Sequence, residues 1–95
     1  LADPVRRRIL ELLGPGEMAS GEVVEAIGAE FGITQAAVSQ HLKVLKESGL
    51  VAETRQGTRH YFAIAPEGIG ELRAYLDGLW SDALAAFARH VESKR

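Results

Sequence analysis

The segment TQAAVSQHLKVLKESGLV, residues 34–51, carries side chains that could recognise the edges of nucleic-acid bases. Glutamine can form paired hydrogen bonds with adenine, serine can donate or accept one, and alanine can contact the methyl group of thymine. At helical spacing these small and polar residues fall opposite Val38, Leu42 and Leu45. The polar face consists of Gln35, Ala36, Ser39, Gln40 and Lys43. Its polarity alone would fit a solvated helix face equally well.

The stretch Arg-Gln-Gly-Thr-Arg-His at residues 55–60 favours nucleic-acid binding over a solvated face. Gly57 suits a tight turn between two strands, because glycine adopts positive φ without strain. Arg55 and Arg59 then flank the turn beside Thr58, where they can reach phosphate or a narrow minor groove. Thr34 can cap the helix that follows it, whose N-terminal N–H groups also attract phosphate.

His41 lies next to the polar face, and its role stays open at this point. It could form a structural hydrogen bond, contact the DNA backbone or, least favoured, bind a metal ion, since no partner ligand lies nearby in the chain. We include it among the candidate DNA-contacting residues. His60 and His90 are isolated, and we predict that both are surface residues.

The net charge of −2 argues weakly against a nucleic-acid partner, but the charge is unevenly distributed. Residues 1–33 have three arginines and six acidic residues, and residues 66–95 have four basic and five acidic residues. Residues 34–65 have four basic and two acidic residues, so their balance is +2. The positive segment is the one that carries the polar face and the basic turn.

Helix start and stop signals divide the chain into five elements. Asp3-Pro4 starts a helix that Gly14 ends, Ser20 can cap a second that Gly32 ends, and Thr34 can cap a third that Gly49 ends. Alternating residues then predict a two-stranded ribbon around Gly57, and Pro66 opens a long final helix. We therefore predict a mainly α fold with a small β-hairpin, a winged helix-turn-helix with a long C-terminal helix, as one domain over residues 1–95.

The final helix has apolar residues on more of its surface than its own domain can cover. A soluble protein does not leave several large apolar side chains exposed, so we expect a second copy to cover them. A single wide core is the alternative. The candidate interface residues are Val5, Ile9, Leu72, Leu76, Leu79, Trp80, Phe87 and Val91.

Composition and motifs exclude several classes of protein. No run of about 18 apolar residues and no secretory signal pattern occurs, and cysteine is absent, so we expect a cytoplasmic protein. The sequence has no glycine-rich phosphate loop and no pairing of a nucleophile with a base, so we expect no enzyme and no cofactor.

Three stretches, ADPVRRRILELL, ITQAAVSQHLKVLKESGLV and RQGTRHYFAI, resemble the ArsR family of bacterial winged-helix repressors. The resemblance covers roughly residues 1–92. It implies a homodimer formed by the first helix and the helix of residues 66–93, with each protomer reading half of a palindromic DNA operator. It also implies that Gln35, Ala36, Ser39, Gln40 and His41 lie in the recognition helix, and that Arg55, Thr58 and Arg59 lie in the wing.

Departures from the family pattern bear on metal sensing. Metal sensors of the family carry a cysteine pair around the helix that here reads SGEVVEAIG, and others build a zinc site from Asp, His and Glu on the last helix. In this chain Gly78 and Leu79 follow Asp77, and only His90 and Glu92 match the distal half of that site. We therefore expect no metal site. The tail resembles the Cys-free branch, whose members often repress their own operon.

Two other functions remain open from the sequence. A winged-helix module could bind protein rather than DNA, although Arg55 and Arg59 favour DNA. A small-molecule-responsive regulator could have a pocket near Trp80, Phe87 and the first helix, although aromatic residues at helical spacing more often form a core.

Overall fold

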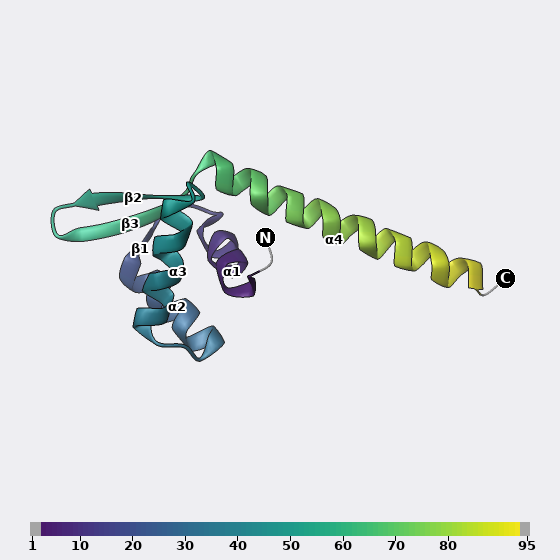
Figure 1. Ribbon diagram of the computed structural model, residues 1–95, viewed down its shortest axis with the longest axis horizontal. Helices are drawn as coiled ribbons and strands as arrows, with labels where there is room; N and C mark the ends of the chain where they lie inside the picture. Colours follow the sequence, from purple (N-terminus) through teal and green to yellow (C-terminus); the bar gives the residue numbers. More distant parts are fainter. Residues whose placement is uncertain (1–2, 94–95) are drawn as a thin grey trace.

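The computed structural model describes residues 3–93 as four helices and a small sheet (Figure 1). The helices are α1 (Pro4–Leu13), α2 (Ser20–Phe31), α3 (Gln35–Glu47) and α4 (Pro66–Ser93). The strands are β1 (Met18–Ala19), β2 (Val51–Gln56) and β3 (Arg59–Ile64). The predicted mainly α fold, a winged helix-turn-helix with a long C-terminal helix, is confirmed.

Two of the three predicted helix caps are confirmed. Asp3 Oδ1 accepts hydrogen bonds from the N–H groups of Val5 (2.9 Å) and Arg6 (3.2 Å), and Thr34 Oγ1 accepts one from Ala37 (3.1 Å). The predicted cap Ser20 is wrong, because α2 begins one residue earlier than expected. Ala19 is the N-cap, and its N–H donates to Glu22 Oε1 at 3.1 Å.

The sheet has three antiparallel strands in the order β1-β3-β2, so the predicted two-stranded ribbon lacked one strand. Strand β1 has two residues, which pair with Phe62 and Tyr61 of β3. A pair this short has no alternation pattern of its own, and its partners lie far away along the chain. The longer pairing of β2 with β3 runs from Val51↔Ile64 to Gln56↔Arg59, and Gly57 turns between the strands with φ of 65°.

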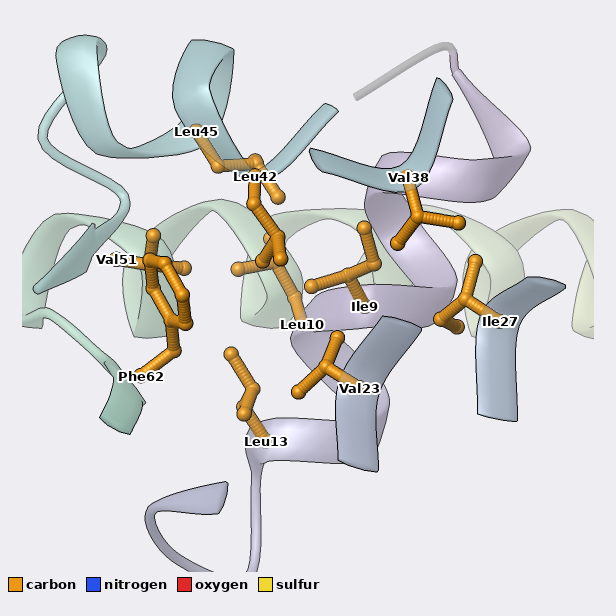
Figure 2. Close-up of a cluster of buried hydrophobic side chains, with 10 residues drawn as sticks. All are labelled: Ile9, Leu10, Leu13, Val23, Ile27, Val38, Leu42, Leu45, Val51 and Phe62. Atoms are coloured by element: carbon orange, nitrogen blue, oxygen red, sulfur yellow. The ribbon is translucent and has the colours of Figure 1, made fainter. Parts of the chain in front are cut away.

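The core is a single cluster of ten buried apolar side chains (Figure 2). Helix α1 contributes Ile9, Leu10 and Leu13, which lie among residues from α2, α3 and the two long strands. Val38, Leu42 and Leu45 of α3 are at most 3% exposed. Because Val38, Leu42 and Leu45 are buried, the opposite side of α3 faces outward.

Helix α4 leaves the domain after a close approach to the end of α3. Ala65 N–H donates to the Leu50 carbonyl at 3.0 Å, and Gly68 packs directly against that carbonyl. Further along, Leu72 packs against the core, and the Arg7 guanidinium of α1 lies 4.4 Å from the ring centre of Tyr75. From Leu76 to Ser93 every residue is exposed, and Figure 1 shows α4 running away from the domain on the side opposite the β2–β3 hairpin.

Candidate nucleic-acid interface

The outward side of α3 carries the polar face that the sequence predicts. All five of its residues are exposed, namely Gln35, Ala36, Ser39, Gln40 and Lys43. They are presented by a helix whose other side is locked into the core by Val38, Leu42 and Leu45. A helix anchored in this way, with an exposed polar surface, has the shape and the hydrogen-bonding groups that a DNA major groove accepts.

A groove of about 580 Å³ separates this face from the hairpin; we call it the wing groove. Its polar walls are Gln35, Ser39, Lys43 and Lys46 of α3, Glu53 of β2 and His60 of β3, and the start of α2 at Ser20 and Gly21 closes one side. Gln35, Ser39 and Lys43 therefore face the hairpin, while Ala36 and Gln40 lie on the part of α3 turned away from it. One edge of the polar face therefore borders the wing groove, and the other edge lies outside it.

Three ionisable groups form a hydrogen-bonded cluster in the wing groove. Lys46 Nζ lies 2.7 Å from Glu53 Oε1, and His60 Nδ1 lies 2.8 Å from Glu53 Oε2. The hydrogen bonds from Lys46 and then from His60 lower the pKa of Glu53 below its ordinary value. The cluster ties the end of α3 to both strands of the hairpin.

Sequence reasoning missed Lys46, Glu53 and His60. The sequence could predict this cluster only in part. Alternation along β2 places Glu53 and Arg55 on one face of the hairpin. Which residue of β3 lies opposite them depends on the strand register, which the sequence does not give. In the structure Arg55 pairs with His60, so both side chains share the face that looks toward α3.

The basic turn forms the outer end of the hairpin. Arg55, Thr58 and Arg59 are all exposed there, and Arg59 pairs with Gln56 at the last register position before the turn. Thr34 is exposed at the start of α3, where its hydroxyl caps the helix. The structure therefore gathers nine of the ten predicted DNA-contacting residues on α3 and the hairpin.

The tenth residue, His41, does not share that surface. Its side chain is 23% exposed and lies on the opposite flank of α3, with Nδ1 4.0 Å from Asp3 Oδ2 at the start of α1. Nδ1 is buried and has no hydrogen-bond partner among the described residues. The reason is helical spacing, which places His41 beside Val38 and Leu45 rather than beside Gln40. We therefore remove His41 from the candidate interface.

The predicted dimer-interface residues fall into three groups. Ile9 is completely buried within the protomer and has no surface to offer a partner. Val5 and Leu72 are half-buried against the core. Leu76, Leu79, Trp80, Phe87 and Val91 are between 41% and 68% exposed, together with Ile69 and Leu84, which the sequence list omitted.

Metal and small-molecule sites have little support from the geometry. Within residues 3–93, no three His, Asp or Glu side chains come together as metal ligands would. Trp80 and Phe87 are 68% and 66% exposed on the protomer, so a pocket built on them would have to form between two chains. The same described part of the chain contains no helix that is long and apolar enough to cross a membrane.

The fold and the interface define a winged helix-turn-helix protein of the DNA-binding class. A family model described as a helix-turn-helix domain matches residues 1–54. The HTH-type transcriptional regulator Rv2034 of Mycobacterium tuberculosis is 40% identical over 94 residues, which is 99% of this chain and 84% of that protein. The transcriptional repressor SdpR of Bacillus subtilis is 34% identical over 64 residues, 67% of each chain.

A solved structure from Mycobacterium bovis extends the likeness through the wing. It is a homodimeric winged helix-turn-helix DNA-binding domain, described as a possible ArsR-family regulator. It matches with a TM-score of 0.63 and 38% identity, covering 87% of this chain and 73% of that one. The chain belongs to the helix-turn-helix family of transcriptional regulators, and within it to the ArsR type. It is a regulator and not an enzyme.

Proposed function

We propose that this chain forms a homodimer that binds a palindromic DNA operator and represses transcription by occupying it. The observation that carries the proposal is the exposed polar face of α3, backed by Val38, Leu42 and Leu45 and flanked by a hairpin that ends in Arg55 and Arg59. Because bacterial DNA lies in the cytoplasm, the protein would act there. Repression, rather than activation, is supported by the relative SdpR.

The proposed homodimer is supported by the exposed stripe of α4. Leu76, Trp80, Phe87 and Val91 recur at spacings of four, seven and four residues, where they line one side of a helix that projects beyond its domain. Covering one large apolar side chain contributes about 1.5–3 kcal/mol, so leaving the stripe in water would be costly. A two-fold axis lets each stripe cover the other, and in the solved M. bovis relative the domain is homodimeric.

We further propose that the repressor does not sense metal through the sites known from its family. The chain contains no cysteine, and His90 and Glu92 are exposed on α4 without further ligands near them among the described residues. Four ligands are the usual requirement of a structural zinc site. The protein-binding module is less well supported, because Arg55 and Arg59 are exposed at the hairpin end.

Base reading by α3 is tested by gel shift against the operator and against shuffled DNA. Ser39→Ala and Gln40→Ala should each weaken operator binding by about 1–3 kcal/mol and leave binding to shuffled DNA unchanged. Glu71→Ala, an exposed site on α4, serves as the control. Equal affinity of both variants and the control for the operator would contradict base reading by this face.

A further inference from the structure

The wing groove lies where one strand of the DNA backbone must pass, if α3 enters a major groove. Adjacent major and minor grooves are separated by a sugar–phosphate strand. A protein that places α3 in one groove and its hairpin in the next must therefore admit that strand between the helix and the hairpin. In this chain that space is the wing groove, which is bounded by α3, β2, β3 and the start of α2.

The wing groove contains a negative charge, which is unfavourable for binding a sugar–phosphate strand of DNA. Lys43 and Lys46 contribute positive charge from α3, and Arg55 shares the groove face of the hairpin. Glu53 is the one carboxylate among the described residues that line the groove. Its negative charge would repel a phosphate, and it is accessible, since the side chain is 21% exposed.

His60 is placed to offset this repulsion. Its Nδ1 lies 2.8 Å from Glu53 Oε2, and its side chain is 38% exposed in the groove. A protonated imidazole donates from both ring nitrogens, so it can bind Glu53 with one and a phosphate oxygen with the other. Among the residues that line the groove, the charges of Lys43, Lys46 and Glu53 sum to +1 with His60 neutral, and protonation of His60 makes the sum +2.

We propose that the wing groove binds one strand of the DNA backbone and that His60, oriented by Glu53, contacts its phosphate as a cation, so that DNA binding takes up a proton. This inference rests on the proposed DNA binding and adds a phosphate site to it. Glu53 and the phosphate favour the charged imidazole, while Lys43, Lys46 and Arg55 oppose it. By linkage, affinity falls as pH rises through the range in which histidine loses its charge, between about pH 5 and 8.

The test measures the affinity for an operator duplex by fluorescence anisotropy from pH 5.5 to 8.5 at constant ionic strength. We expect the affinity of the wild type to fall with rising pH, by up to about tenfold per unit for one proton. His60→Gln should abolish this dependence, whereas His90→Gln, at an exposed site on α4, should retain it. The slope of log affinity against log salt should also be steeper at pH 5.5 than at pH 8.5 in the wild type, by up to about 0.9, and unchanged in His60→Gln.

Glu53→Gln separates an electrostatic role from a merely structural one. If the carboxylate repels phosphate and orients a charged His60, this variant should bind more tightly than the wild type at pH 8.5 and depend less on pH. Uniformly weaker binding at every pH would mean that Glu53 only supports the hairpin, and would overturn the proposal. A flat profile in the wild type, or an unchanged profile in His60→Gln, would overturn it as well. Failure of the wild type to bind any selected DNA would instead refute the proposed function.

Discussion

Asp3 serves two helices with one carboxylate. It accepts hydrogen bonds from two N–H groups at the start of α1, and it also faces His41 of α3 across 4.0 Å. Burial raises the pKa of Asp3, but the hydrogen bonds from Arg6 and Val5, with the charges of His41 and Arg6, together lower it below 3.8. The charged form of Asp3 is therefore the form that the folded protein prefers.

Asp3→Ala should lower the free energy of unfolding at pH 7 by about 1 kcal/mol, the usual effect of removing a helix cap. Since the pKa of Asp3 is lower in the folded state, its charge stabilises the fold above pH 3.8, and this contribution is lost as pH falls through the folded pKa. The difference between wild type and variant should therefore shrink in acid. Urea unfolding at a fixed protein concentration, at pH 7 and pH 3, measures it.

Asp3→Asn is the matched control, because asparagine also caps helices but carries no charge. It should retain most of the stability at pH 7. A loss as large as that of Asp3→Ala would mean that the charge facing His41, and not the cap, is what stabilises this corner.

At the residue scale, the sequence predicts those side-chain hydrogen bonds whose two partners lie close together along the chain. The caps formed by Asp3 and Thr34 were predictable because each bonds within its own first turn. The Lys46–Glu53–His60 cluster was not, because it depends on the register of two strands and on the end of a third element. The surroundings of His41 could not be predicted, because its neighbour Asp3 precedes another helix.

Among the elements, the closest approach of α4 to the segment between α3 and the hairpin is at Gly68. A methyl group on Gly68 would lie 2.1 Å from the Leu50 carbonyl oxygen, which is far inside van der Waals contact. Leu50 connects α3 to β2, so Gly68 sets how closely α4 approaches α3 and the hairpin. Only glycine permits the spacing that the structure has.

Gly68→Ala should therefore destabilise the protein, by about 1–3 kcal/mol, because relieving the clash requires the backbone to shift. Gly70→Ala is the control on the same helix: a methyl group there meets no atom within 4 Å. It should stabilise the protein by about 0.5–1 kcal/mol, since alanine is the better helix former. Thermal and urea unfolding distinguish the two. A stabilising Gly68→Ala would refute the contact.

Helices and strands were predicted correctly where the spacing of apolar residues agreed with the Gly and Pro residues that begin or end elements. Pro66 and a long apolar pattern were enough to predict α4, and Gly57 was enough to predict the hairpin turn. Strand β1 could not be predicted, because two residues have no periodicity. The start of α2 was predicted one residue late, since Ala19, which pairs with Tyr61 in β1, is also the N-cap of α2.

Across the whole molecule, the candidate DNA interface and the apolar stripe of α4 lie at opposite ends. Figure 1 shows the hairpin extending from one side of the helical body and α4 from the other. Contact between two copies through α4 would therefore leave both α3 helices and both hairpins free. In the proposed dimer, two +2 segments would act together on one duplex, although the net charge of each chain is −2.

Trp80→Ala should raise the dissociation constant of the dimer by about tenfold or more and so favour the monomer. The reason is that the Trp80 side chain is 68% exposed on the protomer and would occur twice in a two-fold interface. Trp80→Ala combined with Phe87→Ala should give mainly monomer. Sedimentation equilibrium measures both. Arg89→Ala, on the opposite face of α4 by helical spacing, should leave the dimer intact. A persistent dimer in the double variant would place the interface elsewhere.

Selection of bound sequences from random DNA, with and without added zinc, tests the proposed function most directly. We predict one enriched motif, an inverted repeat with half-sites about one helical turn, roughly 34 Å, apart, obtained equally with and without zinc. The Ser39→Ala and Gln40→Ala variants should lose preference at defined positions of each half-site. No enrichment, or enrichment of a single half-site without symmetry, would contradict a dimeric repressor that reads DNA through α3.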